Sequence, residues 1–298
     1  MSSSHVVSVV LNWNNFEDTR DCVDSLQKIS YKNHDIVIVD NGSTDDSLLR
    51  LQNTFPEVVF VELDRNRGFS GGMNAGISWA VDHGADFTWI LNNDVVIEDF
   101  SILEKLLPYF EMESVGCITP QVFEYPDKET EWFTKGELDR GSGHSTHHKC
   151  ISEKPEQFVE NEYLPLCSTL ISTDVFDEYG LLPERYFIYR EDVAFAYDIS
   201  EKFRMLTILN CRVYHKSSNS SGGDLNRTLT YYTARNRWLL YYKYNHEMSI
   251  FLFVWQYLNW VFVQFLMVMK SQNIDGLIGL TQGTVDGILN KQGRGRYP

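Results

Sequence analysis

The stretch Phe87-Thr88-Trp89-Ile90-Leu91-Asn92-Asn93-Asp94 decides how the rest of the chain is interpreted. It begins as a mainly apolar run, typical of a buried strand, and turns polar at its end. An aspartate just past the carboxyl end of a buried strand lies where open α/β sheets bind their ligands. The Asp94 carboxylate could hold a hard cation such as Mg²⁺ or Mn²⁺, which prefers oxygen ligands. The same residues are also compatible with an ordinary turn.

Strand and helix patterns alternate around this stretch. Apolar runs predict strands at Val6–Leu11, Asp35–Val39 and Val58–Leu63, and helical spacing predicts a helix over Gly71–His83. Strands and helices that alternate with short connections form a mainly parallel sheet with right-handed crossovers. The predicted fold class is therefore α/β, with a mixed, mainly parallel sheet flanked by helices.

The middle of the chain is less regular. Further strands are predicted at Val115–Phe123, Leu164–Ser172 and Met205–Tyr214, and helices at Thr173–Tyr179 and Glu191–Phe203. The segment Gly136–Cys150 is rich in Gly, Ser and His, which predicts a mobile loop. Imidazole and thiol groups in this segment could bind zinc, although a mobile loop is the favoured interpretation. These groups belong to His144, His147, His148 and Cys150.

The carboxyl-terminal part is predicted to be helical and is rich in aromatic residues. The 22 positions from Met248 to Met269 contain no charged residue, and about 20 residues cross a bilayer. A helix packed on the domain, a helix in the membrane interface and a true span all fit this composition. We favour the interfacial helix, because Trp255 and Trp260 suit a headgroup boundary. The Gly-rich segment after Lys270 is predicted to be a flexible surface segment.

Composition limits the possible functions. The chain has 298 residues, which fits one large domain or one domain with an appendage. A formal net charge of −15 argues against nucleic acid as a partner, so any phosphate must be bound by a metal ion, backbone amides or a few cations. The five cysteines form no C-x-x-C pair, and no signal peptide is expected at the amino terminus. These features predict reduced thiols inside a cell.

Four acidic or imidazole side chains are predicted at strand ends, where an α/β sheet gathers its ligand-binding groups. These are Asp40, Asp94, Asp192 and His215. Each also fits a structural role, such as a turn or a helix cap. The glycines of Asn66-Arg67-Gly68-Phe69-Ser70-Gly71-Gly72-Met73-Asn74 could let backbone amides approach an anion at a helix start. This stretch matches neither a Walker loop nor a G-x-G-x-x-G fingerprint.

Taken together, these motifs carry a family resemblance. The segments are Val39-Asp40-Asn41-Gly42-Ser43-Thr44-Asp45, Asn66 to Asn74, Leu91-Asn92-Asn93-Asp94-Val95, Glu191-Asp192 and Tyr231-x-x-x-Arg235-Asn236. In this order they resemble family 2 glycosyltransferases of GT-A fold, and most closely the rhamnosyltransferase-like branch. The likeness covers roughly Val6 to Lys243. It implies a nucleotide-diphosphate-sugar donor and inversion at the anomeric carbon.

The resemblance also implies roles for individual residues. Asp192 would be the catalytic base and Glu191 would face the acceptor. Asp94 and His215 would bind Mg²⁺ or Mn²⁺. The implied donor-binding residues are Asn12, Asn14, Asp40, Asn66, Arg67, Gly71, Gly72, Asn74, Asn93 and Arg235.

Three positions depart from the family pattern. Asn92 stands at the first position of the Asp-x-Asp motif, which leaves one strong metal carboxylate. Ala194 replaces an acidic residue that is common two places after the Glu-Asp pair, and an arginine usual a few positions later has no match near Asp198. These differences affect the expected acceptor contacts more than the reaction class.

The resulting expectation is a GT-A catalytic domain over residues 1–225, with a nucleotide-binding half (about 1–123) and an acceptor-binding half (about 124–225). A helical, membrane-associating region over 226–298 would follow. The enzyme would transfer a hexosyl or deoxyhexosyl group, with inversion and with a metal ion. Its acceptor would be a glycan or a lipid-linked (polyprenyl or dolichyl) hydroxyl or phosphate. It would work at the cytoplasmic face of the cell membrane.

Two alternatives from other functional classes stay open. A nucleotidyltransferase that makes nucleotide sugars uses a related sheet, but it would need a Gly-rich, basic loop where this chain has Asn12-Trp13-Asn14-Asn15. A non-catalytic sugar- or lipid-binding protein could keep the same fold, but it would not need the full acidic set.

Overall fold

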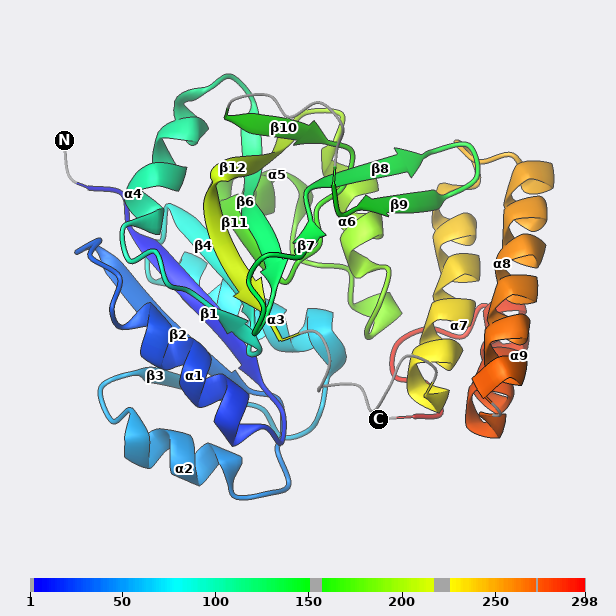
Figure 1. The fold of residues 1–298 in the computed structure, drawn as a ribbon, viewed down its shortest axis with the longest axis horizontal. Coiled ribbons are helices and arrows are strands. Elements are labelled where there is room, and N and C mark those ends of the chain that lie inside the picture. Colours follow the sequence, from blue (N-terminus) through cyan, green and yellow to red (C-terminus); the bar gives the residue numbers. More distant parts are fainter. Residues whose placement is uncertain (1–2, 151–156, 217–225, 272, 298) are drawn as a thin grey trace.

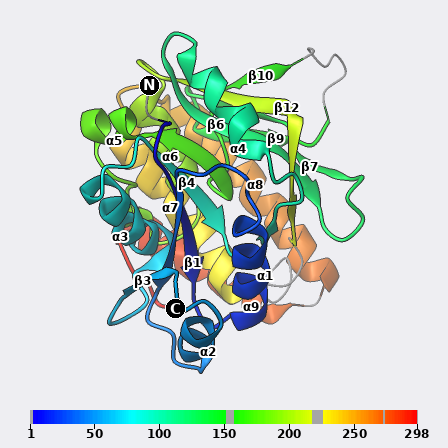
Figure 2. The same cartoon turned by 90° about the vertical axis from the view of Figure 1, so that its left-hand side faces the viewer.

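The protein was analysed as a computed structural model that describes residues 3–150, 157–216, 226–271 and 273–297. Its amino-terminal part alternates strands and helices, as predicted. In chain order the elements are β1 (Val6–Asn12), α1 (Phe16–Leu26), β2 (His34–Asp40), α2 (Ser47–Thr54), β3 (Val59–Glu62), α3 (Gly68–Asp82), β4 (Phe87–Asn92) and β5 (Val95–Val96). The helices α1 and α3 lie on opposite sides of β1 (Figure 2).

The middle of the chain adds further strands and shorter helices. They are α4 (Ile102–Leu106), the 3-10 helix η1 (Leu107–Glu111), β6 (Val115–Glu124), β7 (Glu131–Phe133), β8 (Lys135–Asp139), β9 (His144–His148), β10 (Phe158–Asn161), β11 (Ser168–Ser172), α5 (Thr173–Tyr179), the 3-10 helix η2 (Glu184–Tyr186), α6 (Glu191–Ile199) and β12 (Arg204–His215). Three helices follow, α7 (Arg227–Tyr244), α8 (Ile250–Ser271) and α9 (Ile274–Ile288). They stand beside the sheet-containing part of the molecule (Figure 1).

Among the described residues, one sheet of ten strands runs through the protein. Its order is β10-β12-β6-β11-β4-β1-β2-β3, with β5 paired to β12 and β7 paired to β6. The strands β3, β2, β1 and β4 are parallel, whereas β11 is antiparallel to both β4 and β6. The α/β fold class with a mixed, mainly parallel sheet is therefore confirmed.

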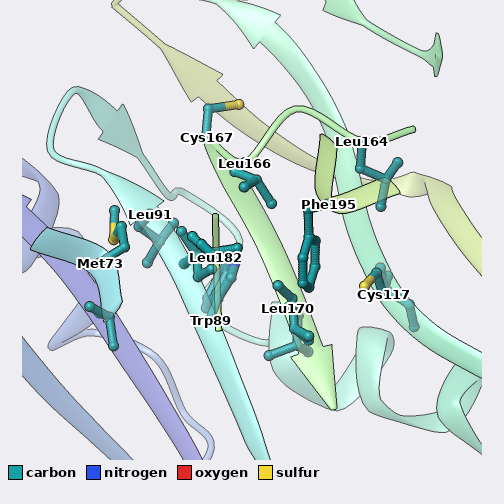
Figure 3. Close-up of a cluster of buried hydrophobic side chains, with 14 of the residues drawn as sticks. Met73, Trp89, Leu91, Cys117, Leu164, Leu166, Cys167, Leu170, Leu182 and Phe195 are labelled. Atoms are coloured by element: carbon teal, nitrogen blue, oxygen red, sulfur yellow. The ribbon is translucent and has the colours of Figure 1, made fainter. Parts of the chain in front are cut away.

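Apolar strand residues explain why this sheet forms. Trp89 and Leu91 of β4 are fully buried. They belong to one apolar cluster with Met73 of α3, Leu170 of β11 and Phe195 of α6 (Figure 3). Burying a large apolar side chain stabilises a fold by about 1.5–3 kcal/mol. The cluster therefore joins both halves of the sheet into a single core.

The strand register aligns the polar residues that end β1, β2 and β4. Asn12 at the end of β1 is paired with Asp40 at the end of β2, and Leu11 is paired with Asn92 at the end of β4. The carboxyl ends of these parallel strands consequently open onto the same side of the sheet.

The predicted mobile loop over Gly136–Cys150 is wrong, because most of it forms the β8–β9 hairpin, with Lys135 paired to His148. The side chain of Leu138 in β8 is buried, and O of Gly141 in the turn accepts a hydrogen bond from the Ser249 backbone N–H at 2.8 Å. The hairpin extends from the sheet toward α7 and α8 (Figure 1).

The predicted flexible segment after Lys270 is also wrong, because it contains α9. Gly279, Gly283 and Gly287 recur every four residues and therefore share one face of this helix. A Cβ on Gly279 would lie 2.3 Å from Arg227 O, and one on Gly283 would lie 2.2 Å from Tyr231 O. The glycines thus let α9 contact the backbone of α7 directly.

Helix α8 presents most of its apolar residues to solvent. Phe251 is 83% exposed, Trp255 66% and Phe262 61%, and three of the 22 residues of α8 are buried. Within the part of the chain that is described, α8 alone is long and apolar enough to cross a membrane.

Candidate active site

A cleft of about 510 Å³ opens at the carboxyl ends of β1, β2 and β4. Asparagine side chains dominate its polar lining, and aromatic rings supply much of the rest. The lining residues are Leu11, Trp13, Asn14, Asn15, Asn41, Asn66, Gly68, Phe69, Asn93, Phe187, Ile188, Tyr189, Asn226 and Thr228. Amide and ring groups of this kind suit a ligand with hydrogen-bonding edges and a flat face.

Asn12 and Asp40 form a buried network beneath the cleft. Asp40 Oδ1 accepts hydrogen bonds from Asn12 Nδ2 at 2.8 Å and from Ser43 Oγ at 2.6 Å. Asp40 Oδ2 accepts from the Ser43 backbone N–H at 2.9 Å. Both carboxylate oxygens therefore fix the turn after β2. Asn14, by contrast, lines the cleft, and its Oδ1 accepts from the Thr44 N–H at 2.7 Å.

The loop that follows β3 forms another part of the wall. Asn66 Oδ1 accepts from the Gly68 N–H at 2.8 Å, and Asn41 Oδ1 accepts from the Arg67 N–H at 2.8 Å. Gly68 has φ of 76°, and a Cβ there would lie 2.2 Å from Phe187 O, so the position requires glycine. The exposed Arg67 side chain pairs with Asp64 at 3.2 Å.

The predicted donor-binding residues that belong to α3 also lie outside the cleft lining. A Cβ on Gly72 would lie 2.5 Å from Leu11 Cδ1, and one on Gly71 would lie 2.8 Å from Arg67 Cβ. Asn74 donates to Leu182 O and to Glu184 Oε1, both at 2.9 Å. These residues pack α3 against β1 and hold the segment before η2, because they lie inside α3 rather than before it.

Asp94 and His215 meet at one end of this region. The pairing of β12 with β5 places His215 beside Val95, and His215 Nε2 lies 3.0 Å from Asp94 Oδ1. Both residues are buried. Neither ring nitrogen of His215 is aligned for a hydrogen bond within the described residues. The neighbouring Asn93 lines the cleft, so this buried pair adjoins it.

The donor set of this pair fits a divalent cation. A carboxylate oxygen and an imidazole nitrogen both bind Mn²⁺, and Mg²⁺ usually takes one or two carboxylates plus phosphate and water oxygens. In the described part of the chain no third His, Cys, Asp or Glu joins the pair to make a larger metal-binding group. The remaining coordination would therefore come from water and from a bound phosphate.

The alternative zinc site in the β8–β9 hairpin does not assemble. His147 Nε2 lies 2.6 Å from Trp132 O, and His148 Nε2 lies 2.9 Å from Glu137 Oε2. No group of three potential ligands occurs there among the residues that the structure describes. Strand alternation explains this, because adjacent side chains point to opposite faces.

Glu191 and Asp192 begin α6 beyond an unusual turn. Phe187, Tyr189 and Arg190 all have positive φ, between 67° and 72°. Burial raises the pKa of both the Glu191 and the Asp192 carboxyl groups, and the charge of Asp192 raises the pKa of Glu191 further. Asp192 Oδ1 accepts from the Val193 N–H at 2.7 Å. A strained turn therefore presents two carboxyl groups with unusual acidity, which is common at active sites.

Asn236 and Arg235 of α7 hold this turn in place. Asn236 Nδ2 donates to the carbonyls of Tyr186, Ile188 and Tyr189 at 2.7–2.9 Å. The fully buried Arg235 donates to Tyr186 O at 2.8 Å through Nη2. Arg235 does not line the cleft, in contrast to its predicted place near a diphosphate, because backbone carbonyls bind its guanidinium.

The segment Asp286–Tyr297 also contacts Arg235 and the 3-10 helix η2. Arg235 Nη1 donates to Gly293 O at 2.7 Å, and the Gly293 N–H donates to Arg185 O at 2.7 Å. Asp286 binds Arg296 Nε at 2.6 Å and Tyr231 Oη at 2.9 Å, and the Arg296 hydrogen bonds hold the pKa of Asp286 well below its usual range. This segment therefore braces the turn that lines the cleft.

Several of the motif residues lie in or next to this cleft, but the motifs do not include every residue of its lining. The side chain of Asn41 lies within a motif that was recognised, yet its place in the lining was not predicted. The aromatic residues Trp13, Phe69, Phe187 and Tyr189 were also missed, because isolated rings in a sequence look like ordinary core residues.

Comparison with protein families gives one long match. The profile described as "Glycosyl transferase family 2" matches residues 8–180. Low-salt glycan biosynthesis hexosyltransferase Agl10 of Haloferax volcanii is 24% identical over 193 residues, which are 63% of this chain and 59% of Agl10. Galactofuranosyltransferase GlfT1 of Mycobacterium tuberculosis is 30% identical over 94 residues, 31% of each chain. The chain thus spans less than two thirds of the length of these relatives.

Solved structures support the fold. The mannosyltransferase PcManGT from Pyrobaculum calidifontis, in complex with GDP-Man and Mn²⁺, matches with a TM-score of 0.60 and 12% identity, over 97% of this chain and 89% of that one. GalNAc-T7 with UDP, GalNAc and Mn²⁺ matches with a TM-score of 0.58 and 16% identity, over 72% of this chain and 44% of that one. At these identities the likeness establishes a shared fold, which is that of GT-A glycosyltransferases.

Proposed function

Because the chain belongs to glycosyltransferase family 2, we propose that it transfers a sugar from a nucleotide-diphosphate donor to a glycan or lipid-linked acceptor, with inversion at the anomeric carbon. One observation carries this proposal. A single cleft joins the polar carboxyl ends of β1, β2 and β4 to the turn that leads into Glu191 and Asp192. The sugar is a hexose or deoxyhexose, in line with the resemblance to the rhamnosyltransferase-like branch.

The lining of the cleft suits the nucleotide part of such a donor. Aromatic rings such as Trp13 and Tyr189 offer flat faces for a base, and the amides of Asn14 and Asn41 can donate and accept hydrogen bonds. Asp40 and Asn12 would act from below by fixing the turn after β2.

Asp94 and His215 would hold Mg²⁺ or Mn²⁺ beside the diphosphate. When bound, such an ion neutralises the negative charge that develops on the departing diphosphate. The chain's own part is to keep a carboxylate and an imidazole buried and 3.0 Å apart at the edge of the cleft.

Asp192 would act as the base in a single displacement. The acceptor oxygen forms a bond to the anomeric carbon, the bond from that carbon to the diphosphate oxygen breaks, and the hydroxyl proton passes to the Asp192 carboxylate. A pKa raised by burial brings this carboxylate closer to the operating pH, which favours proton transfer. Glu191 lies beside it on the acceptor side and, with its own pKa raised, tends to stay neutral.

Helix α8 would bring the enzyme to its acceptor. Its exposed apolar side chains suit the interfacial region of a membrane, and the aromatic ones suit the headgroup boundary. We therefore place the protein at the cytoplasmic face of the cell membrane, where lipid-linked acceptors are reached.

The test of this proposal has two stages. A panel of nucleotide sugars with Mn²⁺ is first screened for thermal stabilisation of the purified protein, because a bound ligand stabilises the folded state by mass action. Sugar transfer or donor hydrolysis is then measured with the stabilising donor, with and without EDTA. Stabilisation by sugar phosphate plus nucleoside triphosphate, with pyrophosphate release, would instead identify a nucleotidyltransferase.

A further inference from the structure

Two arginines close to the acidic pair have no carboxylate partner. Among the described residues, no carboxylate oxygen lies within 4 Å of the guanidinium of Arg190 or of Arg237. Arg190 Nη1 donates to the neutral Ser145 Oγ at 2.8 Å. Arg237 is 9% exposed, its Nε atom is buried without a hydrogen-bond acceptor, and its guanidinium lies 4.4 Å from the centre of the Trp260 ring.

These groups share one electrostatic environment. Burial lowers the pKa of Arg237, and repulsion from Arg190 lowers it further. Burial also lowers the pKa of His144 on β9, and both arginines add to that shift. The negative groups that act on Arg190 are Asp192 and Glu191, and burial makes both of these harder to ionise. Positive charge is therefore concentrated where β9, the start of α6, α7 and α8 come together.

Such an arrangement is costly in the free protein. The two guanidinium groups repel each other, and the buried guanidinium of Arg237 has left water without a carboxylate among the described residues to compensate its charge. A buried cation such as Arg237, without a carboxylate partner in the described part of the chain, marks a candidate site for a ligand that supplies the opposite charge. The expected ligand is an anion with several oxygen acceptors, which matches the forked donors of arginine.

The position of the two arginines favours the acceptor, rather than the nucleotide, as the source of this anion. Neither arginine lines the cleft assigned to the nucleotide. Arg190 immediately precedes Glu191 and Asp192, which face the acceptor in the proposed function, and Arg237 packs against Trp260 of α8. The outer side of α8 exposes apolar residues such as Phe251 and Trp255.

We infer that Arg190 and Arg237 bind the phosphate or diphosphate group of the acceptor, and that the acceptor is a lipid phosphate whose apolar chain runs along α8. This inference rests on the proposed function, because it assigns the acceptor side of the same active site. The cavity beside Arg237 holds about 10 Å³, which is smaller than a phosphate, so α8 must shift as the lipid enters. Only three of the 22 residues of α8 are buried, so few contacts oppose such a shift.

The test compares the full chain with Arg237→Met and with a matched control, Arg212→Met. The guanidinium of Arg212 also lies over an aromatic ring, that of Phe123 at 4.7 Å, but the residue is exposed. Binding is measured to neutral phosphatidylcholine vesicles that contain either farnesyl phosphate or farnesol. Inorganic phosphate is added as a competitor, to separate a lipid phosphate from free phosphate.

The wild-type chain and Arg212→Met should prefer the farnesyl phosphate vesicles. Arg237→Met should lose this preference, with affinity at least about tenfold weaker, as expected for lost charge-assisted hydrogen bonds. Its melting temperature should stay the same or rise, because an uncompensated buried charge has been replaced by an apolar side chain of similar length. Equal affinity for farnesyl phosphate in Arg237→Met, full competition by inorganic phosphate, or a marked loss of stability would each overturn the inference.

A parallel measurement of nucleoside diphosphate binding with Mn²⁺ separates the two sites. Arg237→Met should bind the nucleotide like the wild type, and loss of nucleotide binding would assign Arg237 to the donor and reject the acceptor role. If no form of the chain binds any nucleotide, the proposed function fails, whereas the vesicle measurement still decides the phosphate site.

Discussion

His215 Nε2 lies 3.0 Å from Asp94 Oδ1, although the two residues are more than a hundred positions apart in the chain. The short strand β5 makes this possible by pairing with the end of β12. The rings of Trp132 and His215 pack in a T-shaped arrangement with 4.7 Å between their centres, which shields the imidazole from one side. The pairing of β5 with β12 therefore brings together the two residues that are predicted to bind the metal ion.

Removing the Asp94 charge should abolish metal-dependent activity. Asp94→Asn takes away the one strong carboxylate ligand, so donor turnover should no longer respond to added Mn²⁺. Asn92→Asp should leave metal affinity unchanged or tighten it, because it adds a carboxylate at the end of β4. Turnover measured against Mn²⁺ concentration checks both variants. Wild-type Mn²⁺ dependence in Asp94→Asn would exclude this residue as a ligand.

Asp192→Asn should lower kcat by about 10²–10⁴-fold, the usual contribution of a positioned base. Burial raises the pKa of Asp192, and the base must be ionised. The wild-type kcat/KM should therefore rise with pH up to that raised pKa and then level off, and the variant should lack this rise. Glu201→Gln, which changes an exposed carboxyl group, serves as the control. Undiminished activity in Asp192→Asn would show that the base lies elsewhere.

Glu191→Gln should change how stability depends on pH. The pKa of Glu191 is raised by burial, so the folded chain keeps a proton that the unfolded chain loses above the ordinary value of 4.5. Between that value and the raised pKa, folding takes up a proton and the free energy of unfolding falls as pH increases. The variant should lack this decline in denaturant unfolding at a series of pH values. Parallel profiles for Glu191→Gln and the wild type, with exposed Glu129→Gln as reference, would contradict the prediction.

Asn236→Ala should weaken nucleotide binding, although Asn236 does not line the cleft. It leaves the carbonyls of Tyr186, Ile188 and Tyr189 without their donor, at a cost of about 1–3 kcal/mol for each buried group that stays unsatisfied. The turn should relax, so calorimetry should show a higher Kd for the donor. Asn245→Ala, which removes an exposed hydrogen bond to Tyr242 O, should bind normally. An unchanged Kd in Asn236→Ala would mean that the turn holds its shape alone.

Charging the outer face of α8 should detach the protein from membranes. Phe251→Glu combined with Trp255→Glu places carboxylates at two of its most exposed apolar positions. Co-sedimentation with lipid vesicles should fall strongly, because each charge opposes burial in the interface. Leu49→Glu, at an exposed leucine of α2, is the control. Wild-type sedimentation of the double variant would exclude α8 as the docking surface.

Sequence patterns predicted the amino-terminal half well, for identifiable reasons. The runs around Val9 and Ile90 are mainly apolar, as is typical of strands buried on both faces. The polar residues that end these strands, such as Asp40 and Asp94, lie where an open sheet binds ligands. In the amino-terminal half, the local sequence pattern and the sheet topology therefore indicate the same structure.

The remaining errors came from contacts that no local pattern reveals. The glycines of α9 look like a loop signal until the backbone of α7 is placed 2–3 Å from their missing Cβ atoms. Arg235 looked like a phosphate ligand, but the carbonyls of Tyr186 and Gly293 occupy its donors. The hairpin around Leu138 likewise depends on α7 and α8, which follow it by about a hundred residues.

The brace formed by Asp286–Tyr297 has a consequence for the order of folding. Gly293 accepts a hydrogen bond from Arg235 and donates one to Arg185, about a hundred residues earlier in the chain. Contacts between such distant parts of a chain form only after a large loop has closed. The wall of the cleft at Phe187–Tyr189 should therefore reach its final shape late in folding.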